Sequence, residues 1–248
     1  MKSYLIIRAI FIITTVFISS CYMASDIYKL STFDEQTEYL MGREIISKEI
    51  DSIVVSVNFE EQLDNDFTFL ISIENNSEHP IFVEPNRIFV ETFDNNLIRL
   101  QPQWDTMYAI DPEMKIVEIS QQCKNRESEY KTSTNINAVF GLLSIISDAA
   151  LSSREKVVEN LINDIDYFAT KQIIENENYN ARKAELLDTK NFWQNEVIRK
   201  TDLYPSERIS GKCFIPLVNE AGFLKLHILI EDKDFIYTFK QIRLTARS

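Results

Sequence analysis

Between residues 53 and 93 the sequence alternates hydrophobic and polar side chains in short runs, which predicts β-strands. The clearest run begins at Phe67, where every second residue is apolar and therefore shares one face of the strand. That face needs a second apolar layer to cover it, so the pattern is typical of a β-sandwich. The alternating apolar positions are Phe67, Phe69, Ile71 and Ile73.

Further strands are predicted on both sides of this run. The β-branched residues 53–59 predict the first strand, and residues 81–83 and 87–93 continue the sheet with a break at Pro85. Near the C-terminus, residues 223–230 and 235–244 predict two antiparallel strands joined by a turn. The chain therefore begins and ends with β-structure.

The period changes at Ala138, where an almost purely apolar segment, residues 138–151, predicts a short buried helix. Ser152 followed by Glu155 fits a capping box and predicts the start of a second helix. A stripe at helical spacing then gives that helix one apolar face, which is a candidate interaction face. Its members include Val157, Leu161, Ile165 and Phe168.

The helical segment is read as a hairpin inserted between strands, and it has three interpretations. Its apolar surface covers the open face of the sandwich, or it forms a surface for self-association or for a protein partner. Insertion into a membrane is the third, but Asp148 and the short length of the 138–151 run argue against a span.

The predicted fold is mainly β: an immunoglobulin-like antiparallel β-sandwich plus a helical hairpin insertion. Residues 1–20 are read as a signal peptide and residues 21–50 as a lipidated N-terminus and tether. The sandwich comprises residues 51–137 and 201–248, and the helical insertion comprises residues 138–200.

The N-terminus carries the features of an export signal. Lys2 and Arg8 supply positive charge before an apolar run, residues 9–18, that is too short to span a bilayer. The run ends in Ile18-Ser19-Ser20-Cys21, which resembles the lipobox of bacterial lipoproteins. The resemblance implies a lipid anchor on Cys21 and location in the bacterial cell envelope. Tyr22, which is not aspartate, favours the outer membrane where the cell has one.

Two motifs resemble immunoglobulin-like domains of secreted and lipid-anchored bacterial proteins. The first runs from Phe69 through Asn75-Asn76-Ser77 to Ile81 and is similar to an early strand pair. The second, Leu203-Tyr204-Pro205-Ser206-Glu207 to Gly211, is similar to the entry to a late strand, with Ser206 where that pattern prefers glycine. The resemblance implies a binding or scaffolding role and supplies no catalytic residues.

The net charge restricts the kind of partner, and the cysteine content restricts the possible disulfides. Residues 21–248 carry 24 Lys and Arg (26 minus Lys2 and Arg8) against 38 Asp and Glu, which gives a net charge of 24 − 38 = −14 and disfavours nucleic acid as a partner. Lipidation of Cys21 leaves Cys123 and Cys213. A disulfide between them is one interpretation, and Cys213 as a small buried hydrophobe is the other.

Candidate catalytic and ligand-binding groups are few. His79 precedes a proline and is read as a turn residue, and His227 is read as a residue on the polar face of a predicted strand. Neither is expected to act as a general base. Residues 64–66 are read as a turn because they lack the rest of a calcium loop. Four aromatic residues are candidates for a stacking surface: Trp104, Tyr108, Trp193 and Tyr204.

The sequence contains no hydrolase, zinc or phosphate-loop motif, and no cofactor or metal is expected. We therefore expect a membrane-anchored, non-enzymatic structural or protein-binding module. The alternative is a periplasmic or surface glycan-binding protein or a carboxylate-dependent hydrolase, with its site on the sandwich loops.

Overall fold

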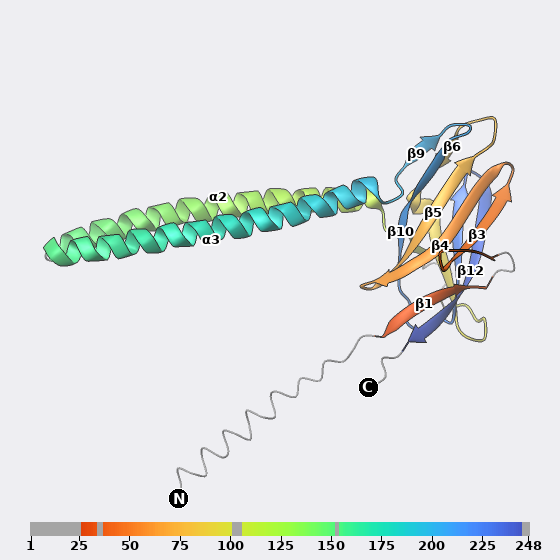
Figure 1. The fold of residues 1–248 in the computed structure, drawn as a ribbon, viewed down its shortest axis with the longest axis horizontal. Helices are drawn as coiled ribbons and strands as arrows, with labels where there is room; N and C mark the ends of the chain where they lie inside the picture. The colour runs from red at the N-terminus through yellow and green to blue at the C-terminus, as the bar shows by residue number, and fades with distance from the viewer. Residues whose placement is uncertain (1–25, 34–36, 101–105, 152–153, 245–248) are drawn as a thin grey trace, which may run out of the picture.

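The computed structural model describes residues 26–33, 37–100, 106–151 and 154–244; for helix residues 135–169 it describes the backbone alone. The chain forms an antiparallel β-sandwich from which a long helical hairpin projects (Figure 1). The predicted fold class, a β-sandwich with a helical hairpin insertion, is confirmed.

The sandwich consists of two five-stranded antiparallel sheets and a small two-stranded sheet. The first sheet has the order β1 (Ile27–Thr32), β12 (Lys233–Leu244), β11 (Phe223–Ile230), β7 (Ile88–Phe93) and β8 (Met107–Tyr108). The second has the order β10 (Arg208–Pro216), β5 (Asp66–Asn75), β4 (Ile53–Leu63), β3 (Arg43–Ile50) and β2 (Thr37–Leu40). The small sheet pairs β6 (Ile81–Val83) with β9 (Thr201–Leu203), and the 3-10 helix η1 (Pro85–Arg87) precedes β7.

The core lies between the two large sheets, and the predicted alternation in β5 is confirmed. Its four apolar positions, Phe67 to Ile73, have no exposed surface. The rings of Phe69 and Phe239 meet across the layers with their centroids 5.2 Å apart. Tyr237 is also fully buried, and its hydroxyl donates a hydrogen bond to the Val55 carbonyl at 2.7 Å. This bond satisfies a polar group that would otherwise destabilise the core.

The predicted C-terminal hairpin is confirmed, because β11 pairs with β12 from Phe223–Lys240 to Ile230–Lys233. The expected pairing around the turn at residues 75–80 is different. β5 pairs with β4 and β10, whereas β7 lies in the opposite sheet and β6 pairs with β9. The chain therefore crosses between layers at this turn instead of forming a hairpin.

The prediction of a tether over residues 21–50 is wrong for residues 27–32, 37–40 and 43–50, which form strands. Strand β1 adds an edge to the first sheet, and β2 and β3 add the edge of the second. Tyr28, Leu30 and Ile46 are buried. Each of these strands buries only a few apolar side chains, so the sequence lacks the continuous alternation that identifies β5.

The insertion consists of two helices, α2 (Pro112–Leu151) and α3 (Arg154–Asn195), and α2 starts well before the predicted boundary at residue 138. The assignment of residues 51–137 to the sandwich is therefore wrong from Pro112 onward. Asp111 caps α2, because its carboxylate accepts a hydrogen bond from the Glu113 amide at 2.8 Å. A capping aspartate followed by proline at the first helical position is a known start signal. The residues that follow this signal are mostly polar, so the sequence lacks the apolar period by which a helix is usually predicted.

Candidate functional site

The helical hairpin is the most prominent feature outside the core. α2 contains 40 residues, which corresponds to about 60 Å at 1.5 Å per residue, and it leads away from the sandwich (Figure 1). Residues 138–151, the apolar segment, form the last part of α2 and lie at the distal end of the hairpin. The interpretation that this segment covers the open face of the sandwich is therefore wrong.

The predicted apolar face of the second helix falls on the first part of α3. Val157, Leu161, Ile165 and Phe168 belong to this helix, but their side chains lie outside the described residues. Because α2 and α3 run antiparallel and are joined at the distal end, this face and the apolar segment of α2 are on the same half of the hairpin (Figure 1).

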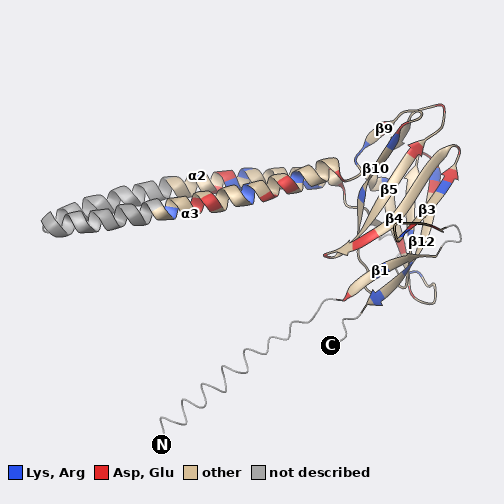
Figure 2. Ribbon diagram, in the orientation of Figure 1, with Lys and Arg blue, Asp and Glu red and all other residues tan. Residues whose placement is uncertain are grey.

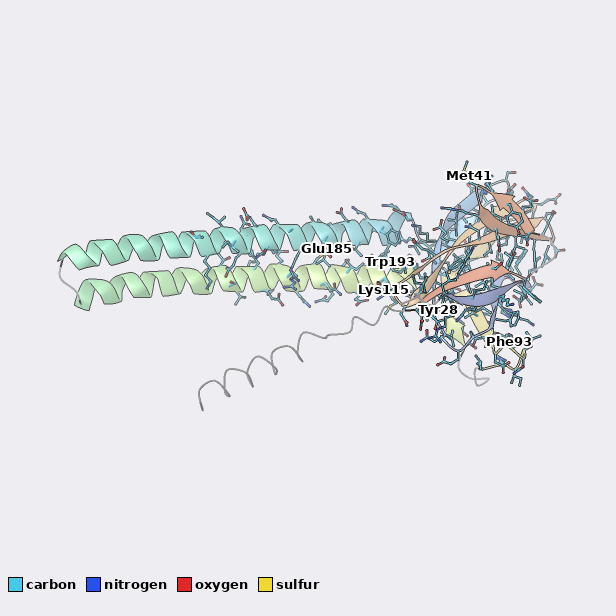
Figure 3. All side chains as sticks on the ribbon, turned by 60° about the horizontal axis from the view of Figure 1, so that its bottom comes forward. Tyr28, Met41, Phe93, Lys115, Glu185 and Trp193 are labelled. Atoms are coloured by element: carbon cyan, nitrogen blue, oxygen red, sulfur yellow. The ribbon has the colours of Figure 1, made fainter. Side chains whose placement is uncertain are left out.

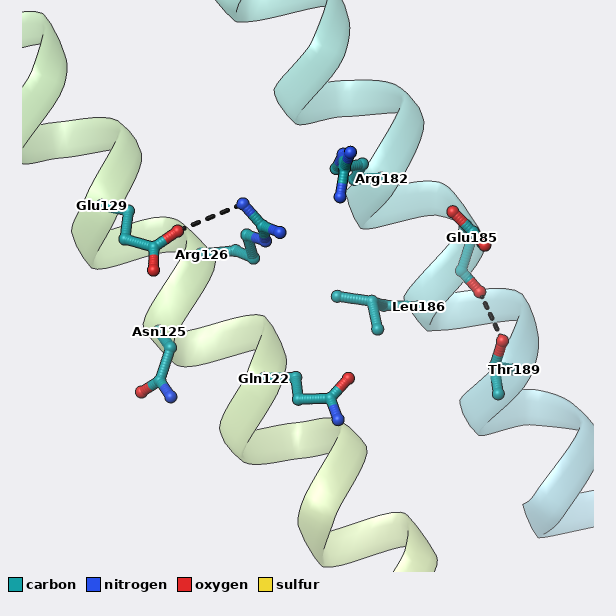
Figure 4. A pocket seen from close by; sticks show the side chains of 8 residues that line it. All are labelled: Gln122, Asn125, Arg126, Glu129, Arg182, Glu185, Leu186 and Thr189. Carbon is teal, nitrogen blue, oxygen red and sulfur yellow. Dashed lines mark hydrogen bonds and ion pairs between the residues drawn. The ribbon is translucent and has the colours of Figure 1, made fainter. Parts of the chain in front are cut away.

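The seam between the helices is polar over most of its described length. Tyr130 stacks on Tyr179 with ring centroids 4.4 Å apart, and the Ser133 hydroxyl donates a hydrogen bond to Glu175 at 2.9 Å. Closer to the sandwich, Arg126 and Arg182 border a gap of about 390 Å³ between the helices (Figure 4). Acidic and basic residues are interspersed along the described part of both helices (Figure 2).

This part of the hairpin buries little apolar surface. Among its described side chains, residues 112–134 and 170–195, only Pro112 and Ile119 are buried. Large apolar side chains are instead exposed, among them Val117, Ile173 and Leu187. Long helices owe most of their stability in water to a packed apolar face. The hairpin therefore gains little stability from this half of its own seam.

A groove with a volume of about 760 Å³ lies where the hairpin meets the sandwich, and we call it the base groove. Its inner wall is aromatic: the Phe214 ring centroid lies 5.1 Å from that of Trp193 and 5.9 Å from that of Phe192. Lys115 and Trp193 mark the two helices at this junction (Figure 3). The remaining lining includes Leu63, Ile110, Ile119 and Leu186.

Acidic side chains dominate the rim of the base groove. It includes four carboxylates, Asp64, Asp66, Glu118 and Asp188, and one lysine, Lys115. Lys115 forms an ion pair with Glu118 at 3.0 Å. Partial burial raises the pKa of Asp66, and the nearby Asp64 raises it further, while Lys115 acts in the opposite direction.

A bidentate ion pair closes the base of the hairpin. The Arg199 guanidinium donates to both carboxylate oxygens of Glu113, at 2.7 and 2.9 Å. This hydrogen bonding lowers the pKa of Glu113 and raises the pKa of Arg199. Glu113 belongs to the first turn of α2 and Arg199 follows α3, so the pair connects the entry and exit of the insertion.

His227 lies in β11, with its ring stacked on Phe89 at a centroid distance of 4.7 Å. Its Nδ1 is 2.9 Å from an Asp234 oxygen, and its Nε2 is 3.7 Å from a Glu91 oxygen. His227 is buried, so the prediction of a position on the sheet surface is wrong. His79 is exposed in the turn before β6 and lies 3.8 Å from Glu231.

The predicted aromatic candidates do not form one surface among the described residues. Tyr108 packs beside Phe89, Trp193 lines the base groove, and Tyr204 is exposed in the turn after β9. Trp104 lies outside the described residues. Trp193 is therefore the one predicted aromatic residue that lines the groove, and no sequence pattern indicated its partners, Phe192 in α3 and Phe214 in β10.

The structure shows Cys123 and Cys213 as free thiols, so the disulfide interpretation is wrong. Cys213 is buried in β10, as the second interpretation predicts, and burial raises the pKa of its thiol to about 12. Cys123 is half-buried on α2. The two thiols belong to different parts of the fold, one to the sandwich and one to the hairpin.

Asp64 and Asn65 form the turn between β4 and β5, and Asp66 begins β5. In the described ranges, no group of three or more His, Cys, Asp or Glu side chains is arranged to hold a metal ion. No described helix is long and apolar enough to span a membrane. The signal peptide and lipobox, residues 1–21, lie outside the described residues.

Comparisons with protein families, with curated proteins and with solved structures found no match to this chain. The resemblance to bacterial lipoproteins and to immunoglobulin-like domains therefore remains a prediction from the motifs. The structure assigns the protein to an architectural class: β-sandwiches that carry a long helical hairpin.

Proposed function

We propose that this protein is a lipid-anchored, non-enzymatic protein of the bacterial cell envelope, and that its hairpin binds a protein partner through the distal end. The lipobox-like sequence ending at Cys21 supports the anchor. The sandwich serves as the folded base, and the hairpin holds its distal end about 60 Å away from that base.

One observation carries this proposal: the apolar segment 138–151 lies at the end of the hairpin that is farthest from the sandwich. Its sequence is apolar on almost every side, with Asp148 as its one charged residue. A single neighbouring helix covers only one stripe of such a surface. The remaining apolar positions need another protein surface, and contiguous exposed apolar patches are typical of interaction sites.

The distal end is tested with a photo-crosslinking residue placed at Leu142 in the full chain in cells. We expect a discrete crosslinked species, formed either with a second copy or with another protein. The triple variant Phe140→Ser, Leu143→Ser, Ile146→Ser should abolish that species, because it removes apolar surface from the same segment. The same crosslinker at Lys124, an exposed position on the polar half of α2, is the matched control.

Equal crosslinking from residues 124 and 142, or no effect of the triple variant, would contradict binding through the distal end. Circular dichroism and the unfolding midpoint of the variant must match those of the unchanged protein. This comparison separates loss of binding from loss of the sandwich fold.

The anchor is tested separately with Cys21→Ser. We expect this change to move the protein from the membrane fraction to the soluble fraction and to abolish incorporation of a labelled fatty acid. Acyl chains supply the membrane affinity, at roughly 0.8 kcal/mol per buried methylene. Cys123→Ser is the control and should change neither result. Retention of the Cys21→Ser protein in the membrane would disprove the anchor.

A further inference from the structure

The base groove provides a binding surface that is independent of the distal end of the hairpin. Its volume of about 760 Å³ falls within the range of small-ligand and peptide pockets, which is roughly 300 to 1,000 Å³. It is built from three parts of the chain: the start of α2, the end of α3, and the β4–β5 turn with β10. All of its lining side chains belong to the described residues.

The inner wall of the base groove is suited to an apolar or cationic group. Phe214 is buried, while Phe192 and Trp193 are half-buried and border the open space. Leu63, on the side of the sandwich, is about half exposed. Aromatic faces attract ammonium and guanidinium groups as well as apolar side chains.

The rim carries a net negative charge, because Lys115 is its one cation against four carboxylates. Glu118 has a lysine partner, but in the described part of the chain the carboxylates of Asp64, Asp66 and Asp188 have neither an ion pair nor a hydrogen bond. The proximity of Asp64 and Asp66 is unfavourable when both are ionised. A cation bound at this rim relieves that repulsion, whereas a neutral ligand does not.

We propose that the base groove binds a peptide segment of another protein in which lysine or arginine side chains alternate with apolar ones. The apolar side chains pack on Phe192, Trp193 and Leu63, and the cationic side chains meet Asp66 and Asp188 at the rim. Because the groove spans the sandwich and both helices, such a segment also fixes the hairpin at its base.

The test uses the full chain and a fluorescently labelled decapeptide of alternating arginine and leucine, with fluorescence anisotropy as the measurement. We expect saturable binding that weakens as salt is added, because exposed charge pairs are screened. The double variant Asp66→Asn, Asp188→Asn should weaken binding about tenfold, on the basis of two partly exposed charge contacts. Asp66→Asn is compatible with the fold, since burial already disfavours the ionised carboxyl.

Two controls address charge and position. Peptides with glutamate or glutamine in place of arginine should bind much more weakly. The variant Asp202→Asn, which removes an exposed carboxylate on β9, should bind as the unchanged protein does. A third variant, Leu63→Asn, should weaken binding without any change in net charge and so reports the apolar contribution.

Equal binding of the arginine and glutamine peptides, or an unchanged affinity of the double variant, would overturn the proposal. Binding of neutral oligosaccharides in place of the cationic peptide would also overturn it and would assign the groove to a glycan. Because these measurements leave residues 138–151 unchanged, failure here and failure of the distal-end proposal are distinguishable.

Discussion

Asn75, at the end of β5, illustrates how one polar side chain holds several strands together. Its side chain is fully buried, and its Nδ2 donates hydrogen bonds to the carbonyls of His79 and Leu203 at 2.9 and 2.8 Å. Its Oδ1 accepts hydrogen bonds from the backbone amide and the hydroxyl of Ser77. This asparagine belongs to the first immunoglobulin-like motif in the sequence, and its four hydrogen bonds explain why an amide is needed there.

Replacing Asn75 with alanine should destabilise the protein by about 1–3 kcal/mol, because the buried hydrogen bond to the Leu203 carbonyl is lost together with the bonds to His79 and Ser77. The urea midpoint measures the change. Asn76→Ala, at the adjacent exposed position, is the control and should shift the midpoint little. Similar effects of both substitutions would mean that the buried amide has no special role.

Cys213 and Cys123 should differ sharply in reactivity. The pKa of the buried Cys213 thiol is raised to about 12, so at pH 8 its thiolate fraction is on the order of 10⁻⁴. We expect an aromatic disulfide reagent to modify Cys123 in the native protein and Cys213 only after unfolding. The reaction that requires unfolding should be absent from the Cys213→Ser variant. Two fast thiols in the native state would contradict the burial of Cys213.

At the scale of elements, burial decides which segments the sequence could predict. β5 and β11 lie in the interior of the two sheets, and their alternating apolar residues were sufficient to identify them. β1 and β2 are edge strands with few buried positions, so their sequences resemble a tether. The first half of α2 was missed for the same reason, because its seam is polar.

The Glu113–Arg199 pair should stabilise the base of the hairpin in a pH-dependent manner. The pKa of Glu113 is lowered in the folded protein. The contribution of Glu113 to the free energy of unfolding is therefore fully present above the ordinary pKa of 4.5 and is lost as the pH falls through the lowered value. Arg199→Ala should therefore lower stability at pH 7, by less than about 1 kcal/mol because both side chains are partly exposed.

The unfolding midpoints of the Arg199→Ala variant and the unchanged protein should approach each other at a pH below the lowered pKa of Glu113. Lys131→Ala is the control, because Lys131 pairs with Glu127 on the same helix and does not connect the ends of the insertion. If the difference in unfolding midpoint between Arg199→Ala and the unchanged protein stays constant with pH, the role of the ion pair is contradicted.

For the whole molecule, the hairpin is expected to act as a spacer of defined length. Tyr130 faces Tyr179 and Ser133 faces Glu175, so the facing positions of the two helices are known. Deleting residues 124–130 together with 179–185 removes two turns from each helix at matching positions. The distal end and the sandwich keep their sequences.

This paired deletion should shorten the maximum dimension in small-angle scattering by about 10 Å, or seven residues at 1.5 Å each. Light scattering should give the same oligomeric state as for the unchanged protein, because residues 138–151 remain. Deletion of residues 124–130 alone is the control and should lower helicity by shifting the facing positions. An unchanged maximum dimension after the paired deletion would show that the hairpin does not extend from the sandwich.

The elements that can be predicted from the sequence are those whose side-chain period repeats over many residues. The sequence predicted the β5 face, the C-terminal strand pair and the existence of a helical insertion, because burial of one face imposes a period on the sequence. It also supplied the export and lipobox-like motifs, which are short and local.

Only the tertiary structure decided where these elements lie. Tertiary packing puts residues 27–32, 37–40 and 43–50 in the sheets and Cys213 in the core, and it positions the apolar segment far from the sandwich. The base groove joins residues that are distant in sequence, such as Asp66, Lys115 and Trp193. Contacts of this kind depend on how separate elements pack, and no local pattern records that packing.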